Sequence, residues 1–296
     1  MCHAAKVHPY LYRMTRAAFQ SHFQLTLQSA GVPPEEVRAL WARWTEWVGE
    51  SRLAYALENP LEALPHVENH LEVLRRLAAH EPWAHIVGFV DFAGLQVSID
   101  HRALIPRPET EELLGMLLAQ HPEDAALQAL DWSTGSGCLA LGMKHARSLW
   151  HVAGWDVSEE ALSLARRNGQ TTGLDIAWRN ASLSDPPSGP AEAWDILVSN
   201  PPYIHPDEEC TLDASVRDYE PSLALFSPAE DVLFFYRRLQ VWASYQLRSG
   251  GSLWLECHAD HAQSTAKLFA YPSNWKDVQI HRDFCGKERF ISAQKL

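Results

Sequence analysis

The sequence predicts an α/β protein in which a small helical domain precedes a doubly wound, mostly parallel β-sheet. Apolar residues recur at helical spacing through residues 1–83. From about residue 106, short apolar runs alternate with amphipathic segments, the pattern of a sheet that carries helices on both faces. A turn rich in small residues, Thr134–Gly137, follows the first of these runs and opens a helix, as in nucleotide-binding α/β folds.

Composition limits the kinds of function that the chain can have. Its 296 residues are 46% hydrophobic and 21% charged, which is typical of globular soluble proteins. The sequence contains neither an apolar run of membrane-spanning length nor a recognisable signal peptide, so we expect a cytoplasmic protein with no membrane partner. Five scattered cysteines fit a reducing compartment. The formal charge of −12 disfavours a stable nucleic-acid partner, because affinity for phosphates comes largely from Lys and Arg.

Histidine is abundant, and a metal site therefore has to be considered. The one tight cluster, Cys257, His258 and His261, lacks the paired ligand spacing of a structural zinc site. We expect no metal.

The N-terminal segment, residues 1–83, is predicted to form a helical bundle. Phe19, Phe23 and Leu27 recur at four-residue spacing, and a tryptophan-rich stripe from Val37 to Val48 has a period near 3.6. A further helix is indicated between Val67 and Leu77. These stripes predict a bundle core, and no residue among them has the character of a catalytic group.

Residues 84–105 change period and predict a linking β-hairpin. Ile86–Phe92 and Leu95–Ile99 indicate two short strands around Ala93-Gly94. The segment 106–296 would then form the catalytic domain. Its sheet has seven predicted strands, of which five end near Trp132, Asp156, Asn180, Ser199 and Glu256 and two late ones span about 277–284 and 288–295.

The first predicted strand of this sheet leads into a candidate cofactor loop. Small residues in Asp131–Gly137 allow the backbone to approach a ligand, and the following helix offers unpaired N–H groups. The next strand ends in Asp156, about 20 residues further on, where an acid hydrogen-bonds the ribose hydroxyls of a nucleoside. Asp156 could also cap the helix that follows it.

The spacing Asp-x-x-x-Gly-x-Gly resembles the first motif of class I methyltransferases, which bind S-adenosylmethionine. A dinucleotide enzyme would carry a third glycine where Leu139-Ala140 stands. The resemblance implies a Rossmann-like fold and a cofactor site formed by seven residues: Asp131, Ser133, Thr134, Gly135, Ser136, Gly137 and Asp156. Relatives usually have glycine at the position of Ser133, where a positive φ would cost a serine about 1 kcal/mol or more.

The stretch Ile196–Tyr203 carries the chemical motif, Asn-Pro-Pro-Tyr. A buried strand delivers Asn200 to the carboxyl edge of the sheet, and Pro201 and Pro202 stiffen the turn. The Asn200 side-chain oxygen and the Pro201 carbonyl can accept the two N–H hydrogens of a planar nitrogen, on which Tyr203 stacks. A fixed near-attack pose contributes roughly 7 kcal/mol or more. We therefore predict that Asn200, Pro201, Pro202 and Tyr203 are catalytic and bind the substrate, with Asn200 also bordering the cofactor.

This motif alone leaves the substrate open. Adenine N6, guanine N2 and glutamine amides all present similar planar nitrogens. A rigid strand-exit turn with no catalytic role is the alternative for the motif taken in isolation.

Further segments resemble the release-factor glutamine N5-methyltransferases (the HemK/PrmC family). The resemblance covers nearly the whole chain, is weakest over the first 70 residues, and is carried by these segments: Glu81–Gly88, Leu104–Leu113, Glu220–Leu225, Gly250–Glu256 and Arg282–Arg289. It implies methyl transfer to the glutamine of the Gly-Gly-Gln loop in peptide-chain release factors. The N-terminal helices would grip the release factor away from the chemistry.

The same resemblance implies roles for individual residues. Asn200–Tyr203 would bind the glutamine side chain, with Arg107 and Glu109 beside the substrate. Pro186 would border the cofactor, although relatives often carry an aromatic residue there. Arg107 and Glu109 could instead be a simple surface pair.

Three other functions remain open at this point. A related family methylates a glutamine of a ribosomal protein, and the cofactor loop suits either target. An N6-adenine methyltransferase would explain Asn-Pro-Pro-Tyr, but neither the acidity nor the lack of a basic recognition insert. A non-catalytic binding module would explain the departures at Ser133 and Pro186, but not the presence of Asp156 and Asn200.

Overall fold

The structure is a computed structural model that describes residues 14–49, 63–185, 191, 193–270 and 274–296. The chain divides into two compact units, residues 1–87 and 88–296. No helix in the described ranges is long and apolar enough to cross a membrane.

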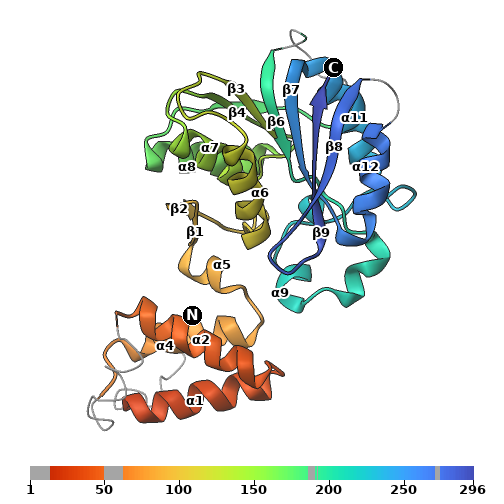
Figure 1. Ribbon diagram of the computed structural model, residues 1–296. Helices are drawn as coiled ribbons and strands as arrows, with labels where there is room; N and C mark the ends of the chain where they lie inside the picture. The colour runs from red at the N-terminus through yellow and green to blue at the C-terminus, as the bar shows by residue number, and fades with distance from the viewer. Residues whose placement is uncertain (1–13, 50–62, 186–190, 192, 271–273) are drawn as a thin grey trace, which may run out of the picture. The chain divides into compact units, whose positions relative to one another are not determined.

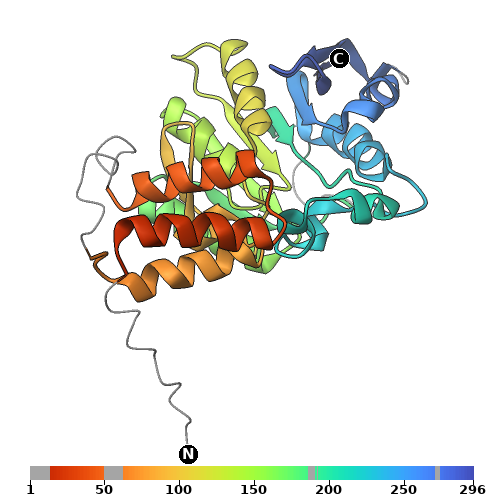
Figure 2. The same cartoon turned by 90° about the horizontal axis from the view of Figure 1, so that it is seen from below.

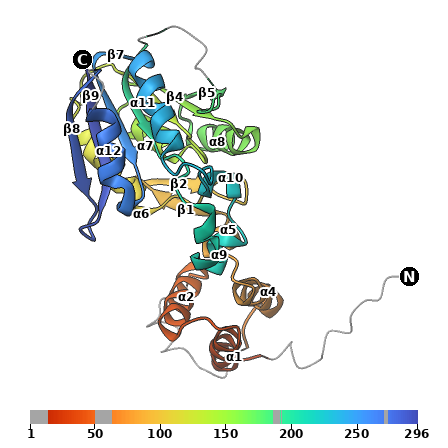
Figure 3. The ribbon, with the colours of Figure 1, turned by 90° about the vertical axis from the view of Figure 1, so that its right-hand side faces the viewer.

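In its described residues, the first unit is a bundle of three helices with a short fourth helix at its end. The helices are α1 (Arg16–Ser29), α2 (Pro34–Trp47), α4 (Val67–Ala78) and α5 (Trp83–Val87). Figure 2 shows α1, α2 and α4 side by side, and Figure 3 shows them end on. The Thr15 hydroxyl caps α1 by accepting from the Ala18 N–H, and Pro34 occupies the first turn of α2.

The predicted apolar stripes meet in the core of this bundle. Phe19, Phe23 and Trp44 are fully buried, and the Trp41 and Trp44 rings stack with their centroids 4.8 Å apart. Trp47 departs from the expected core, since 45% of its surface is exposed. Aromatic packing thus holds the bundle together, as the periodicity predicts.

The second unit contains one seven-stranded sheet in the order β5-β4-β3-β6-β7-β9-β8 (Figure 1). Its strands are β3 (Gln128–Trp132), β4 (His151–Asp156), β5 (Ala177–Asn180), β6 (Trp194–Ser199), β7 (Leu247–Glu256), β8 (Trp275–Arg282) and β9 (Glu288–Lys295). The five strands from β5 to β7 in this order are parallel, whereas β9 is antiparallel to both β7 and β8. The predicted mostly parallel, seven-stranded sheet is confirmed.

Helices cover both faces of this sheet, with α11 and α12 on the opposite side from α6, α7 and α8 (Figure 3). Their bounds are α6 (Pro108–Ala119), α7 (Cys138–Ala146), α8 (Glu159–Thr172), α11 (Phe234–Gln246) and α12 (Ala262–Ala270). Successive side chains of β3 point to opposite faces of the sheet. Leu130 and Trp132 belong to the core beneath α11 and α12, and Ala129 belongs to the core beneath α6 and α7. The doubly wound arrangement follows from strands that are apolar on both faces.

A β-hairpin begins the second unit. Strands β1 (Phe89–Phe92) and β2 (Leu95–Ser98) are antiparallel. Asn168 of α8 secures β2, because its amide both accepts from the Ser98 N–H and donates to the Ser98 carbonyl, each at 3.0 Å. The strand expected from Ile86 begins only at Phe89: Ile86 and Val87 close helix α5, and Gly88 then turns the chain with φ of 86°.

Short elements connect β6 to α11 and β7 to α12. They are the 3₁₀ helices η2 (Pro206–Thr211) and η3 (Ala259–His261) and the single-turn helices α9 (Ala214–Arg217) and α10 (Ser222–Leu225). The segment through α10 returns to the carboxyl edge of the sheet, since the Ile204 N–H donates to the Leu225 carbonyl at 3.0 Å. This return brings the end of α10 beside the turn that follows β6.

Candidate active site

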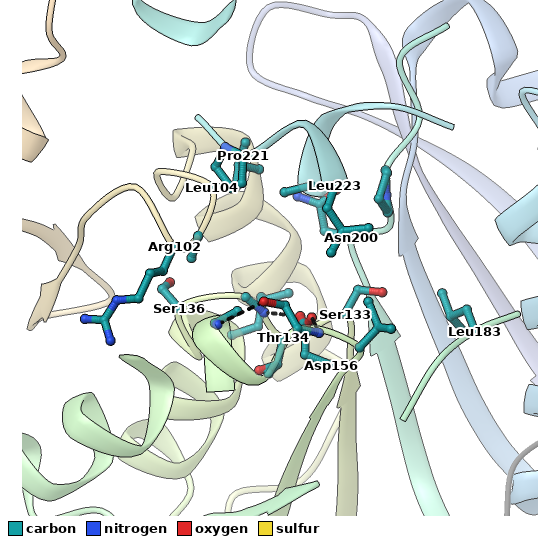
Figure 4. Close-up of a pocket in the computed structure, with 18 of the residues that line it drawn as sticks. Arg102, Leu104, Ser133, Thr134, Ser136, Asp156, Leu183, Asn200, Pro221 and Leu223 are labelled. Atoms are coloured by element: carbon teal, nitrogen blue, oxygen red, sulfur yellow. Dashed lines mark hydrogen bonds between the residues drawn. The ribbon is translucent and has the colours of Figure 1, made fainter. Parts of the chain in front are cut away.

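A pocket opens at the carboxyl ends of β3, β4 and β6, the edge at which α/β folds bind ligands (Figure 4). The turn after β3 contributes Ser133–Ser136, the end of β4 contributes Asp156 and Val157, and the turn after β6 contributes Asn200 and Pro202. The pocket is also lined by Leu223 of α10 and by Arg102, Ala103, Leu104 and Pro106. The structure thus brings the predicted cofactor loop, the predicted ribose acid and the predicted catalytic asparagine into one cavity.

The turn after β3 is held in place by its neighbour β4. The N–H groups of Ser133 and Thr134 both donate to the Trp155 carbonyl, at 2.8 and 3.0 Å. This geometry gives Ser133 a φ of 70°, in the left-handed region that favours glycine. Ser133 therefore has the positive φ considered in the sequence analysis. Its backbone conformation costs about 1 kcal/mol or more compared with glycine.

Asp156 both lines the pocket and ties two elements together. Its Oδ2 accepts from the Gly135 N–H at 2.8 Å, and its Oδ1 accepts from the Ser158 N–H at 2.9 Å. Each oxygen keeps a further lone pair for a ligand. Burial raises the pKa of this carboxyl, and the backbone N–H groups oppose the rise. The helix cap itself is Ser158, whose hydroxyl accepts from the Ala161 N–H, so the alternative that Asp156 caps α8 is not observed.

Asp131 lies beneath the turn and is absent from the residues that line the pocket. Its Oδ2 accepts from the Thr134 hydroxyl at 2.5 Å and from the Ala140 N–H at 3.2 Å. Its Oδ1 is buried and has no hydrogen-bond partner among the described residues. Burial raises the pKa of Asp131 to about 7.

Gly137, like Asp131, is not among the residues that line the pocket. Close packing against a neighbouring side chain requires a glycine at this position. It has φ of 84°, and a Cβ on it would lie 2.7 Å from the Trp178 ring. Trp178 of β5 therefore supports the cofactor loop from below. Pro186, the remaining predicted cofactor residue, lies outside the described residues.

These groups fit S-adenosylmethionine by their chemistry. Asp156 offers two acceptors to a ribose, and Val157 and Leu183 offer apolar surface beside it. The Oδ1 of Asp131, buried and without a partner among the described residues, leaves a free acceptor under the turn that would suit the ammonium group of an amino acid. Among the described residues, no cluster of three or more His, Cys, Asp or Glu could hold a metal ion.

The Asn-Pro-Pro-Tyr turn is anchored by hydrogen bonds to two other elements. Asn200 donates from Nδ2 to the Thr110 hydroxyl at 3.2 Å, and Thr110 donates to Oε2 of Glu256 at 2.7 Å. The Tyr203 hydroxyl donates to Oε1 of the same carboxylate at 3.2 Å. Burial raises the pKa of the Tyr203 hydroxyl, which stays a donor. Of the two prolines, Pro202 lines the pocket and Pro201 is buried behind it.

The sequence motifs do not identify two further residues of this site, Glu256 and Thr110. Glu256 ends β7 and is 1% exposed, and Thr110 lies in the first turn of α6 and is 3% exposed. Burial raises the pKa of Glu256, while the Thr110 hydroxyl and the positive charge of Arg289 oppose the rise. For Glu256 the sequence does contain a signal, because it is a carboxylate at the carboxyl end of a buried strand, as Asp156 is.

Arg107 forms an ion pair with a residue other than the one the sequence suggests. Its guanidinium donates to Oε1 of Glu220 at 2.5 Å, and Oε2 of Glu220 accepts from the Ile105 N–H at 3.0 Å. The Glu220 side chain is 1% exposed. The alternative of a simple Arg107–Glu109 surface pair is therefore not observed. Glu109 is half-buried nearby, where its charge acts on Glu256 and Arg289.

Comparisons with known proteins identify the family to which the chain is similar. Residues 112–217 match the family model described as the methyltransferase small domain. A release factor glutamine methyltransferase of Bacteroides thetaiotaomicron is 34% identical, over 89% of this chain and 94% of that protein. One of Deinococcus radiodurans is 37% identical over 91% and 94%, and one of Lactococcus lactis is 40% identical over 75% and 81%.

A solved methyltransferase of Pyrococcus furiosus superposes with a TM-score of 0.49 and 16% identity, covering 77% of this chain and 98% of that one. The predicted class I methyltransferase fold is confirmed by the sheet order and by the family match. With a third of its residues identical to the Bacteroides protein over nearly the full length of both, this chain belongs to the release factor glutamine methyltransferase family.

Proposed function

We propose that this enzyme transfers a methyl group from S-adenosylmethionine to the side-chain amide nitrogen, N5, of the glutamine in the Gly-Gly-Gln motif of peptide-chain release factors. The family assignment supplies the enzyme class, the cofactor and the substrate class. One observation supports the assignment of roles: Asn200 opens into the same pocket as Asp156 and the turn after β3 (Figure 4).

The cofactor would be held by residues from three successive strand ends. Asp156 would accept from the ribose hydroxyls, and the turn Ser133–Ser136 would lie along the amino-acid end, with Asp131 beneath it. When bound, S-adenosylmethionine supplies an electrophilic methyl group on a sulfonium centre. Apolar side chains at the rim, such as the exposed Leu223, would limit the access of water to this centre once the cofactor is bound.

The glutamine amide would be held by the turn after β6. An amide nitrogen is a poor nucleophile because its lone pair is delocalised. The Asn200 Oδ1 and the Pro201 carbonyl would accept its two hydrogens, which directs the nitrogen face into the pocket and disperses the positive charge that develops on the nitrogen. Tyr203 would offer its ring as a flat contact while its hydroxyl is occupied by Glu256.

The three predicted segments of the chain have separate proposed roles. Residues 1–83 would bind the body of the release factor, residues 84–105 would link the parts of the chain, and residues 106–296 would carry the chemistry. The proposed partner would be a protein of the translation machinery, and the enzyme would then act in the cytoplasm. The net charge of −12 supports a protein substrate over a stable nucleic-acid partner.

The test is radiolabelled methyl transfer from S-adenosylmethionine to purified release factor, with a Gln→Ala change in its Gly-Gly-Gln loop as the control substrate. Label on the wild-type factor alone is the expected result. Label on both factors would mean another acceptor residue. Label on neither factor would contradict the proposal that release factors are the substrate. The ribosomal protein and then adenine-containing DNA would be assayed next.

A further inference from the structure

We infer that Thr110 and Glu256 are positioning residues that determine which end of the Asn200 amide faces the substrate. The inference rests on the proposed function, because it concerns how Asn200 meets the glutamine amide. Neither residue is itself placed in contact with the reacting nitrogen.

A continuous hydrogen-bonded chain joins three elements that are distant in sequence. It runs from Asn200 after β6, through Thr110 in the first turn of α6, to Glu256 at the end of β7, and then to Tyr203. The Oδ1 atom of Asn200 accepts no hydrogen bond from the described residues. The chain thus engages the nitrogen of the Asn200 amide and leaves its oxygen for a ligand.

The direction of this chain follows from counting donors and acceptors. An ionised carboxylate only accepts, and each hydroxyl carries a single hydrogen. With both hydroxyl hydrogens directed to Glu256, the Thr110 oxygen has only lone pairs to offer to Asn200. Asn200 must then turn its NH₂ group toward Thr110, which directs Oδ1 to the opposite side.

The alternative orientation would be unproductive. The oxygen and nitrogen of an asparagine amide are nearly equal in size, so shape alone does not distinguish the two rotamers. If the amide were flipped, Asn200 would present N–H donors to the N–H hydrogens of a glutamine, and no bond could form. The glutamine nitrogen would then lack one of its two proposed acceptors.

Burial raises the pKa of Glu256, and the hydroxyls of Thr110 and Tyr203 together with nearby positive charge oppose this rise, so the carboxylate accepts both hydroxyls in its ionised form. Arg289 on β9 lowers the pKa of Glu256 by its positive charge, and Asp283 holds the Arg289 guanidinium at 2.9 Å. Glu109 acts in the opposite direction. The Tyr236 hydroxyl donates to the backbone carbonyl of Glu256 at 3.0 Å, which fixes the end of β7 independently of the carboxylate.

The test uses the full-length enzyme with Thr110→Val, which keeps the side-chain shape but removes the hydroxyl, and Thr110→Ser, which restores it. Thr265→Val is the matched control, because Thr265 on α12 has a fully buried hydroxyl with no partner in the described residues. We expect Thr110→Val to lower kcat by on the order of 100-fold with unchanged cofactor affinity. Thr110→Ser should recover most of this loss, and Thr265→Val should cause none.

A double-mutant cycle separates positioning from a merely structural effect. If Thr110 acts through Asn200, adding Thr110→Val to an Asn200→Ala enzyme should cause no further loss of kcat. Losses that multiply in the double variant would overturn the inference.

A second readout needs no substrate. The side-chain NH₂ signals of Asn200 in a ¹H–¹⁵N spectrum, identified by their absence in Asn200→Ala, should shift and exchange faster with solvent in Thr110→Val and return in Thr110→Ser. Unchanged signals in Thr110→Val would overturn the inference even in an enzyme that fails to methylate release factor. A wild type that shows these signals but does not label the factor would instead contradict the proposed function alone.

Discussion

The backbone N–H of Gly135 donates to Oδ2 of Asp156 at 2.8 Å, so the residue expected to bind the ribose also holds the cofactor turn. The second oxygen of Asp156 holds the Ser158 N–H at the start of α8. In the proposed role of Asp156, the shape of the pocket and its affinity for a nucleoside would depend on the same carboxylate.

Asp156→Asn should weaken cofactor binding at least about tenfold while leaving the fold intact. The amide retains one acceptor but presents NH₂ hydrogens either to the Gly135 N–H or to the Ser158 N–H, which costs roughly 1–3 kcal/mol. Calorimetric titration with S-adenosylmethionine measures the change. Asp124→Asn, at an exposed loop position, is the control. Equal affinities for wild type and Asp156→Asn would argue against the role of Asp156.

Ser133→Gly should stabilise the protein by about 1 kcal/mol, because glycine adopts φ of 70° without the Cβ clash that serine experiences. Urea unfolding monitored by tryptophan fluorescence gives the free energy of unfolding. Ser133→Ala is the matched variant, since it removes the hydroxyl but keeps the Cβ. If alanine stabilised the protein as much as glycine, the hydroxyl rather than the backbone would be responsible.

Asp131→Asn should change how stability depends on pH in the absence of cofactor. The pKa of Asp131 is about 7 in the folded protein against an ordinary value of 3.8, so the folded state binds more protons between these values. Stability is consequently lost as pH rises through that window, by up to about 1.4 kcal/mol per pH unit from this residue. Asparagine has no proton to lose.

The free energies of unfolding of the wild type and Asp131→Asn are compared by urea unfolding at about pH 5.5 and about pH 8. These conditions lie on the order of one unit either side of the pKa of about 7. We expect the free energy of unfolding to fall more steeply in the wild type than in Asp131→Asn. Other buried carboxyls such as Glu256 contribute equally to both proteins, so the difference isolates Asp131. Parallel pH profiles would show that Asp131 is ionised at its ordinary pKa.

Arg107→Ala should destabilise the protein by about 2 kcal/mol, because it leaves the buried Glu220 carboxylate without its charged partner. Glu220→Gln can keep an acceptor for the Ile105 N–H, and adding Arg107→Ala to it should then cost much less. Chemical unfolding of the wild type, the two single variants and the double variant gives the coupling free energy between Arg107 and Glu220. Additive losses would mean that Arg107 acts through something other than Glu220, such as direct contact with the substrate.

Much of the fold could be predicted because its signals are local. The alternation of apolar strands with helices gives the sheet, and the spacing of Asp131, Gly135 and Gly137 gives the turn after β3. Strand boundaries were less certain: the strand expected at 277–284 runs from Trp275 to Arg282, and Ile86 lies in a helix. Such shifts occur because apolar periodicity marks the middle of an element more strongly than its ends.

The site was predictable only where one segment carries the whole signal. Asp156 ends a buried strand, Asn200 follows another, and both line the pocket. The partners of these residues were not visible, since Thr110 and Glu256 are 146 positions apart and Arg107 and Glu220 are 113 positions apart. Contacts of this range depend on how the sheet is assembled, which no short stretch of sequence encodes.

The most direct test of the central claim compares Asn200→Ala with the wild type in two measurements on the same preparations. One is the single-turnover rate of methyl transfer to release factor, and the other is the calorimetric affinity for S-adenosylmethionine. If Asn200 holds the glutamine amide, the rate should fall by on the order of 100-fold or more while the affinity stays within a few-fold. An equal loss of rate and affinity would contradict the assigned role and make Asn200 a cofactor-binding residue instead.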